Sequence, residues 1–467
     1  MFRKVILSIL IVSMAVSLGL SIYSGIIPNG YLIGLALVYL CLGVISAFLV
    51  KRKKKILLIL GVILSLLLVA VSIILSIVLI RVQLIFDNVS NVNTEVSSYS
   101  VAVLKSSDYY KIEDLIGADL GILSAGDDYY NKALKALEDK GNFKYEEYDN
   151  EFVLATSLID KEVAAIVLNE AYISILDEGI EGFADDIRIL DVTQVEVEEK
   201  ITSDNEINLE ANEAFNVYIS GIDTYGEIAS VSRSDVNIIA TINPSTGKIL
   251  LTNVPRDMYV QLAGTNGLKD KLTHAGVYGI NTSIDTLENF LDIDISYYVR
   301  INFSSLIKLV DYIGGIDVYS SYAFKAGDRY YTQGMNYNLN GQEALAFSRN
   351  RYAFSDGDRQ RGRNQEQVIA AIINKVTQSK DINVYLNLLT TLENSFQTNM
   401  DKATINSFVH KQLENNYNWE IMFSDVNGYD SSNYTYSYPW QKLYVMEVDS
   451  NSLNNAKVKI NSVLNGN

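Results

Sequence analysis

Three long apolar runs open the chain, and polar and apolar positions alternate at shorter spacing after them. The runs Val5–Tyr23, Tyr31–Val50 and Ile56–Ile80 are 19, 20 and 25 residues long, and each is long enough to cross a bilayer. The first run is not followed by the small-residue cleavage site of a signal peptide, and two more runs come next. We therefore expect residues 1–81 to be a membrane region with helices near 5–23, 31–50 and 56–80.

The charges around these runs predict their orientation. Arg3 and Lys4 precede the first run, five basic residues at 51–55 join the second run to the third, and Ser24–Gly30 carries no charge. By the positive-inside rule, the N-terminus and the basic loop are cytoplasmic. Three crossings then predict a multi-pass protein of the cell membrane with a large C-terminal extracellular region.

A stalk and a small α/β accessory domain are expected next. Asp87–Ser98 is rich in Asn, Ser and Val, and we place the stalk at residues 82–97. The accessory domain covers residues 98–212 and ends in an acid-rich linker, Val195–Asn212. Its predicted elements are a strand at Ser100–Leu104, a short helix at Lys111–Ile116, a strand at Asp119–Leu123 and a helix at 127–139, after which Glu151–Leu158, Ala164–Leu168 and Ala171–Leu176 continue the alternation. Residues 98–194 contain no metal, nucleophile or phosphate motif, which favours a spacer role.

Residues 213–467 predict a second domain, which begins with three strands. Phe215–Ser220, Val236–Ile242 and Lys248–Val254 are separated by turn sequences. In a meander, the end of the first strand, the start of the second and the end of the third share one edge of the sheet. Asp223, Asp235 and Arg256 would then converge, although Gly, Ser and Asp at strand ends are also ordinary turn chemistry.

Helical patterns follow in this domain. Asn281–Leu291 carries an apolar stripe of Ile284, Leu287 and Leu291, which by default is core. The other predicted elements are a helix at Phe303–Ile313 that Gly314-Gly315 ends, a helix after Asn364, a mostly helical stretch at Asp381–Leu413 and a late strand at Lys442–Met446.

Composition excludes several classes of function. The net charge is −17, and residues 1–81 hold 8 of the 38 Lys and Arg residues and no acid, so the rest of the chain has 30 basic against 55 acidic residues. So acidic a surface repels nucleic acid over most of its area. The one cysteine, Cys41, lies in the second apolar run, so the later domains have neither a disulfide nor a thiolate nucleophile.

An arginine cluster is the clearest candidate for chemistry in this acidic chain. Residues 349–365 contain five arginines and two aspartates. Guanidinium groups fit phosphate oxygens with two-pronged hydrogen bonds, so the cluster indicates a polyanion site, and a solvated loop of Arg–Asp pairs is the alternative. Asp223 and Asp235 at one sheet edge are a minimal carboxylate set for Mg²⁺ beside phosphate oxygens. The residues that would neutralise a pyrophosphate are Arg256, Arg349, Arg351 and Arg361.

Other chemistries are poorly served. The Gly-rich loop with Lys that cradles nucleotide phosphates is absent from the sequence. Of the two histidines, His274 is expected to be a structural hydrogen-bonding residue and His410 to be incidental. Two histidines without a cysteine outside the membrane region also argue against a zinc site.

Several different short motifs follow one another along roughly residues 213–465. They are Asp223 after a strand, Arg233-Ser234-Asp235, Val254-Pro255-Arg256-Asp257, Lys271-Leu272-Thr273-His274-Ala275, Ile313-Gly314-Gly315-Ile316-Asp317-Val318, Gly341-Gln342-Glu343-Ala344-Leu345-Ala346, Arg349-Asn350-Arg351, and Asp358 with Arg361 and Gln365. Together they resemble the LytR-CpsA-Psr family of Gram-positive cell-envelope proteins. Three spans and an accessory domain ahead of these motifs look like the capsule-associated streptococcal members.

The resemblance implies an α-β-α catalytic domain with a central mixed sheet that binds a polyprenyl pyrophosphate lipid, with the lipid tail in an apolar pocket to which the stripe on 281–291 contributes. It implies Mg²⁺-dependent transfer of capsular polysaccharide or a related glycopolymer from this carrier to peptidoglycan, with other capsule-assembly proteins as further partners. Carried over by motif, Asp223 and Asp235 would bind the metal, and the pyrophosphate would be held by Arg256, Arg349, Arg351, Arg361 and Gln365.

Some alternatives stay open. Many family members have Arg-Gln where this chain has Asn364-Gln365, so we expect one phosphate contact to be missing or to come from Arg359 or Arg363. Either Asp223 or Asp358 would deprotonate the acceptor hydroxyl. A non-enzymatic regulator or scaffold of capsule assembly and a polyprenyl pyrophosphate phosphatase are the competing functions.

Overall fold

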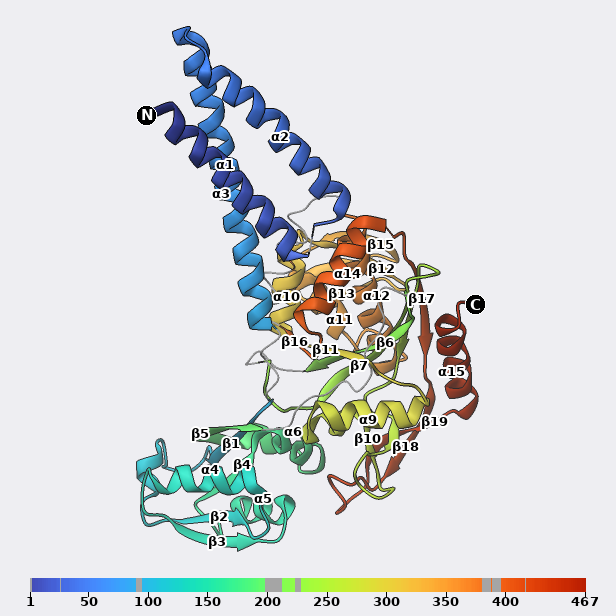
Figure 1. Ribbon diagram of the computed structural model, residues 1–467. Coiled ribbons are helices and arrows are strands. Elements are labelled where there is room, and N and C mark those ends of the chain that lie inside the picture. Colours follow the sequence, from blue (N-terminus) through green and yellow to red (C-terminus); the bar gives the residue numbers. More distant parts are fainter. Residues whose placement is uncertain are drawn as a thin grey trace.

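The chain folds into a bundle of three long helices, an accessory domain and a larger C-terminal domain (Figure 1). The structure is a computed structural model, and it describes residues 2–25, 27–89, 95–197, 212–222, 228–379, 388, 396–415 and 417–467. The helix bundle projects from one end of the molecule, and the accessory domain lies at the other end, beyond the C-terminal domain.

The three apolar runs form the long helices, as predicted. Their bounds are α1 (Phe2–Ser24), α2 (Asn29–Lys51) and α3 (Lys55–Val89). Each contains a stretch of mean hydropathy 2.5 or more, enough to cross a membrane. Small polar side chains pack between them, as in the hydrogen bond of 3.1 Å between the hydroxyls of Ser17 and Tyr39.

The predicted stalk at residues 82–97 is wrong. Helix α3 continues to Val89, and the first strand of the accessory domain begins at Glu95. Residues 90–94 lie outside the described part of the chain. The region therefore contains the end of a long helix and the start of a strand, because polar composition alone does not exclude either element.

The accessory domain is a five-stranded sheet of order β3-β2-β4-β1-β5 with helices packed on it. The predicted strands and helices are present, the one at Lys111–Ile116 as a single 3₁₀ turn at Ile112–Leu115. Two strands were not predicted. β3 has the charged sequence K-Y-E-E-Y, and β5 pairs antiparallel with β1 from Ile187 to Val197, so the predicted linker begins only after that strand. Residues 198–211 of the linker lie outside the described residues. The bounds are β1 (Glu95–Leu104), β2 (Asp119–Leu123), α4 (Asp128–Glu138), β3 (Lys144–Tyr148), α5 (Glu151–Ile159), β4 (Ala165–Asn169), α6 (Glu170–Gly179), α7 (Phe183–Asp186) and β5 (Ile187–Val197).

The C-terminal domain is built on a six-stranded mixed sheet of order β16-β11-β6-β7-β8-β17. The antiparallel pairs β6–β7 and β7–β8 form the predicted meander, and β11 and β17 add to it in parallel. The bounds are β6 (Phe215–Ile222), β7 (Ser234–Asn243), β8 (Lys248–Asn253), β11 (Tyr297–Asn302), β16 (Phe396–Thr398) and β17 (Glu420–Asp425).

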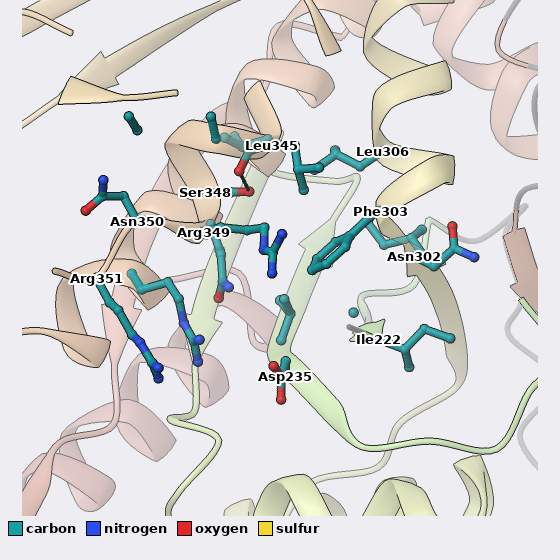
Figure 2. A pocket seen from close by; sticks show the side chains of 18 of the residues that line it. Ile222, Asp235, Asn302, Phe303, Leu306, Leu345, Ser348, Arg349, Asn350 and Arg351 are labelled. Carbon is teal, nitrogen blue, oxygen red and sulfur yellow. Dashed lines mark hydrogen bonds between the residues drawn. The ribbon is translucent and has the colours of Figure 1, made fainter. Parts of the chain in front are cut away.

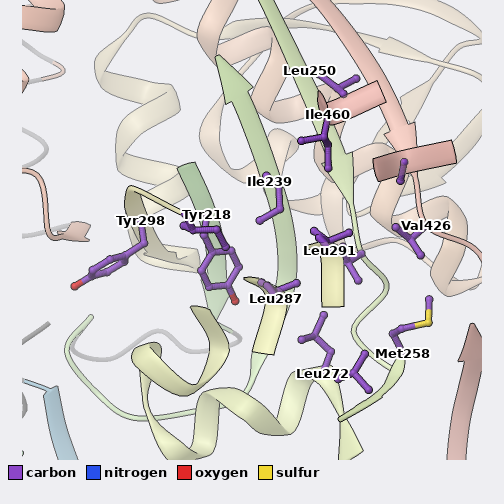
Figure 3. Close-up of a cluster of buried hydrophobic side chains, with 14 of the residues drawn as sticks. Tyr218, Ile239, Leu250, Met258, Leu272, Leu287, Leu291, Tyr298, Val426 and Ile460 are labelled. Atoms are coloured by element: carbon purple, nitrogen blue, oxygen red, sulfur yellow. The ribbon is translucent and has the colours of Figure 1, made fainter. Parts of the chain in front are cut away.

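Helices cover both faces of this sheet, as the α-β-α resemblance implies. The apolar stripe of α9 (Ile280–Leu291) and α15 (Ser450–Leu464) pack on one face, where Leu287, Leu291 and Ile460 meet Ile239 and Leu250 of the strands (Figure 3). On the other face lie α10 (Phe303–Tyr312), α11 (Gly341–Arg349), α12 (Asp358–Thr377) and α14 (Lys402–Asn415).

Shorter elements complete this domain. They are α8 (Leu272–Ala275) and the strand pairs β9 (Tyr259–Gln261) with β10 (Lys269–Lys271), β12 (Ile316–Ser320) with β15 (Gly334–Leu339), β13 (Phe324–Ala326) with β14 (Arg329–Tyr331), and β18 (Gly428–Asn433) with β19 (Leu443–Val448). The helical prediction for 381–413 is wrong at β16, and residues 380–387 and 389–395 lie outside the described residues. β16 pairs with only one neighbour, β11, so it is a short edge strand whose three residues give no period.

A buried ion pair joins the accessory domain to the C-terminal domain. Glu95 at the start of β1 lies 2.5 Å from Arg300 of β11, and the two side chains are 5% and 1% exposed. The other Glu95 carboxylate oxygen accepts the backbone N–H of Ile280 at 3.0 Å. The two domains are therefore linked by an ion pair that is shielded from water.

We expect Glu95→Ala to destabilise the protein by about 3–5 kcal/mol, because it leaves the buried Arg300 charge without its anion and beside the neutral side-chain oxygen of Gln397, 3.3 Å away. Thermal unfolding of the full chain in detergent measures this. The double variant Glu95→Ala/Arg300→Met should recover most of the lost melting temperature, since no charge then stays buried. A single variant that melts like the wild type would contradict the importance of the pair.

Candidate active site

A pocket of about 720 Å³ opens where the ends of β6 and β7 meet the N-terminal end of α10, the C-terminal end of α11 and the first turns of α12 (Figure 2). One part of its wall is apolar. Those side chains come from strands β6 and β11 and from the three helices, and they are Ile222, Ile301, Phe303, Leu306, Leu345, Val368 and Ile369. This part is lined by α10, α11 and α12, whereas α9 packs in the core on the opposite face of the sheet. The implied contribution of the α9 stripe to the pocket is therefore wrong.

The rest of the wall carries charge. Six of the predicted site residues line this one pocket, from four different parts of the chain: Asp235, Arg256, Arg349, Arg351, Arg361 and Gln365. Figure 2 shows Arg349, Arg351 and Asp235 around the same opening as Phe303. Asp223 lies outside the described residues, so its predicted role stays a prediction.

Helix α12 explains how several of these residues reach the pocket. It begins at Asp358, although a helix was predicted only after Asn364. Because the helix already includes Arg361, that arginine, Gln365 and Val368 follow one another at spacings of four and three residues on one face. The same helical face thus presents a cation, an amide and an apolar side chain to the cavity.

Asp235 and Arg256 meet at the sheet edge, as the meander predicted. The Nη1 atom of Arg256 donates to both carboxylate oxygens of Asp235, at 3.0 and 3.1 Å. Burial opposes the charge on Asp235, but Arg256, Arg233 and Arg361 outweigh it and lower the pKa of that carboxyl. Asp235 therefore stays ionised and Arg256 is held in a fixed place at neutral pH.

Asp358 lies behind the arginines. Its Oδ1 atom is 2.7 Å from Nη2 of Arg361 and 4.0 Å from Nε of Arg256, and the residue does not line the pocket. Burial raises the pKa of the Asp358 carboxyl, and the two arginines oppose that rise. In this structure Asp358 pairs with Arg361 and adds negative charge near Arg256.

Arg349 and Arg351 both line the pocket, but not on one extended segment as predicted. Arg349 is the last residue of α11, and its guanidinium lies 4.1 Å from the centre of the Phe303 ring. Arg351 follows the helix and donates a hydrogen bond of 2.9 Å to the hydroxyl of Tyr352. The helix end, rather than strand alternation, turns both side chains toward the cavity.

The other arginines of the cluster point elsewhere. Arg359 pairs with Asp430 at 2.8 Å and Arg363 with Asp356 at 2.7 Å, and neither lines the pocket. Asn364 is buried and donates to the backbone of Phe347. In this structure neither Arg359 nor Arg363 is placed to replace the missing phosphate contact, because each pairs with a carboxylate outside the pocket. The other half of the expectation, that one phosphate contact is missing, stays a prediction.

His274 is a structural hydrogen-bonding residue, as predicted. Its side chain is fully buried, and its Nδ1 atom lies 2.7 Å from Asp270, so His274 is part of the interior of the domain. Within the described residues, no three His, Cys, Asp or Glu side chains form a metal cluster. Mg²⁺ needs only one or two carboxylates when phosphate oxygens complete its shell, and the ionised Asp235 at the pocket wall fits that requirement.

Sequence reasoning missed two residues at this site. Arg233 was recognised in a motif but given no role, and it lines the pocket. It pairs at 2.7 Å with Glu178, which comes from helix α6 of the accessory domain. No local sequence pattern predicts a role for Glu178, since one glutamate near the end of a helix is usually an ordinary surface residue.

Comparisons with known proteins agree with the family resemblance. The family model described as the LytR_cpsA_psr family matches residues 188–457. The chain is 34% identical over 246 residues to the polyisoprenyl-teichoic acid–peptidoglycan teichoic acid transferase TagU of Enterococcus faecalis. The matched residues are 51% of this chain and 80% of that protein. It is 35% identical over 198 residues to the protein of the same name from Bacillus subtilis, 42% of this chain and 63% of that one. The crystal structure of B. subtilis TagU matches with 29% identity and a TM-score of 0.42, over 54% of this chain and 97% of that chain.

Proposed function

Because this chain belongs to the LytR-CpsA-Psr family, we propose that it is a membrane-anchored transferase that moves a glycopolymer from a polyprenyl-pyrophosphate carrier to peptidoglycan. One observation carries the proposal. A single pocket joins an apolar wall, suited to a prenyl chain, to five arginines suited to a pyrophosphate. The relatives named above are transferases of teichoic acid, and we propose capsular polysaccharide or a related glycopolymer for this chain.

The position of each pocket residue suggests its role in this reaction. The prenyl tail would lie against Phe303, Leu306 and Val368, and the guanidinium groups would hold the two phosphates. Asp235, together with Asp223, would hold Mg²⁺. When bound, the ion supplies positive charge to the phosphate oxygens. Arg256 is fixed by Asp235 and would stabilise the charge that grows on the leaving phosphate.

In the proposed reaction, a hydroxyl oxygen of peptidoglycan attacks the phosphorus that carries the polymer. The bond from that phosphorus to the bridging oxygen breaks, and the prenyl monophosphate leaves. The hydroxyl proton passes to a carboxylate. Asp223 and Asp358 remain the two candidates for this base, and the position of Asp358 behind Arg361 makes its proposed role depend on a shift of that arginine.

A transfer assay tests this function. Full-length protein in detergent would be incubated with Mg²⁺, a prenyl-pyrophosphate-linked saccharide and peptidoglycan, and saccharide attached to the wall would be measured. We expect attachment that requires all components. Release of phosphorylated saccharide into solution without peptidoglycan would favour the phosphatase alternative, and neither product would favour a regulator or scaffold.

The proposed membrane orientation predicts a labelling pattern. In a Cys41→Ser background, which has no other cysteine, Glu162→Cys should react with an impermeant thiol reagent on cells with a permeabilised wall. Lys53→Cys between α2 and α3 should not react until the membrane is opened, because the basic loop is proposed to be cytoplasmic. Both chosen residues are exposed, so burial does not decide the outcome. The reverse pattern would contradict the extracellular placement of the pocket.

A further inference from the structure

Glu178 of the accessory domain is part of a network of charged side chains that reaches the candidate active site. Its Oε1 atom lies 2.7 Å from Nη1 of Arg233, and its Oε2 atom lies 2.6 Å from Nζ of Lys271. Both cations belong to the C-terminal domain. His274 Nε2 is 3.9 Å from the same carboxylate, so three nitrogen-bearing groups of one domain surround one carboxylate of the other.

The network continues from Glu178 to the pocket as an alternation of charges. Lys271 Nζ lies 3.4 Å from Oδ1 of Asp257, and Oδ2 of Asp257 lies 3.5 Å from Nε of Arg256. Arg256 in turn holds Asp235 at 3.0 Å. Lys271 and Asp257 are buried, so little water screens these interactions.

Glu178 is well suited to stay charged in this place. Burial alone would raise the pKa of its carboxyl, but His274, Lys271 and Arg233 outweigh burial and hold that pKa well below its usual range. The side chain is 21% exposed, so water reaches it only in part.

The backbone of the accessory domain also touches the segment that leads into the pocket. The N–H of Val96 in β1 donates to the carbonyl of Ala229 at 2.8 Å, and the N–H of Val231 donates back to Val96 at 2.9 Å. Arg233 follows two residues later. The accessory domain thus holds this segment by its backbone and Arg233 by its side chain.

The end of helix α6 is itself fixed against the C-terminal domain. Tyr438 packs so closely on Gly179 that a Cβ atom there would lie 2.1 Å from the tyrosine ring. The side-chain amide of Gln441 also donates to the carbonyl of Gly179 at 2.5 Å. Glu178 therefore has one defined place, which is what a residue that orients others requires.

We propose that Glu178 is a positioning residue of the active site: it holds Arg233 and Lys271 so that Asp235, Asp257 and Arg256 keep the arrangement that receives the pyrophosphate. This rests on the proposed function. Without the carboxylate, Arg233 is drawn to Asp235 and Lys271 to Asp257, which are other anions of the same network. The charged groups at the pocket then change their places relative to the donor pyrophosphate, and the accessory domain is a component of the catalytic site rather than a spacer.

Binding and turnover of the full chain in detergent test this role. Glu178→Gln keeps the size of the side chain and removes its charge. Its matched control is Tyr172→Phe, which removes the hydrogen bond of 3.0 Å between the hydroxyls of Tyr172 and Tyr278 across the same domain boundary but changes no charged group. Geranylgeranyl pyrophosphate binding and the KM and kcat of saccharide transfer would be measured for both variants, for Arg233→Gln and for the double variant Glu178→Gln/Arg233→Gln.

We expect Glu178→Gln to weaken prenyl pyrophosphate binding and raise the donor KM about tenfold, with Glu178→Asp partly restoring both. Tyr172→Phe should behave like the wild type. Because Glu178 acts in part through Arg233, the loss in the double variant should be smaller than the product of the losses in the two single variants. Wild-type binding and KM in Glu178→Gln, or equal losses in Glu178→Gln and Tyr172→Phe, would overturn the proposal. Wild-type protein that binds the pyrophosphate without transferring saccharide would count against the proposed function alone, and the binding data would still decide the role of Glu178.

Discussion

Replacing Asp235 with asparagine is expected to lower polymer transfer by on the order of 10² to 10³, because a group that places charge against a phosphoryl transition state contributes several kcal/mol. Asn keeps the shape of the side chain and one oxygen for Arg256, which now makes its hydrogen bonds of 3.0 and 3.1 Å to the carboxylate. The measurement is transfer as a function of Mg²⁺ concentration. The variant should require far more Mg²⁺ than the wild type, if it responds at all.

Asp356→Asn is the matched control. Asp356 lies near Asp358 in the sequence and pairs with Arg363 outside the pocket, so its loss should leave both the rate and the Mg²⁺ response unchanged. An Asp235→Asn enzyme that is slow but has the Mg²⁺ response of the wild type would show that Asp235 acts only by holding Arg256. That result would remove the metal assignment and keep the arginine assignment.

Arg351→Lys is expected to reduce transfer about tenfold to a hundredfold, since a hydrogen bond to a charged group contributes about 1.5–3 kcal/mol and lysine loses the two-pronged geometry. The melting temperature should hardly change. Arg351 makes its hydrogen bond to the exposed Tyr352, its sequence neighbour, rather than to the core.

Arg359→Lys separates phosphate binding from general charge. Arg359 belongs to the same cluster but pairs with Asp430 away from the pocket, so its replacement by lysine should leave transfer unchanged. Transfer rates and melting temperatures of both variants would be compared with those of Arg351→Ala. Equal transfer by the wild type, Arg351→Lys and Arg351→Ala would show that the arginine is part of a solvated loop.

The sequence predicts part of this site because local geometry determines it. Once three short strands form a meander, the start of the second and the end of the third must share an edge, and Asp235 and Arg256 meet there at 3.0 Å. The three membrane helices follow from length and hydropathy in the same way. These features depend on neighbours in the chain or on one simple pairing rule.

Other features depend on contacts that no local pattern contains. Helix α12 starts at Asp358 because its polar first turns are held by partners elsewhere, such as Asp430 for Arg359 and the backbone of Phe347 for Asn364. The pairing of Glu178 with Arg233 joins residues 55 positions apart across two domains. Each of these positions has an ordinary polar residue, so only the folded arrangement distinguishes it from solvent-exposed sequence.

The ladder between β1 and β5 has a consequence for how such proteins evolve. Its outermost partners, Glu95 and Val197, are the points where the chain enters and leaves the accessory domain, and paired strands lie about 4.8 Å apart. Gene rearrangement can therefore add or remove the whole module by joining ends that are already one strand apart, while helix α3 and strand β6 keep their paths. A lineage that lost the accessory domain would leave Arg300 without Glu95. Proteins without this domain should therefore have an uncharged residue at the position of Arg300.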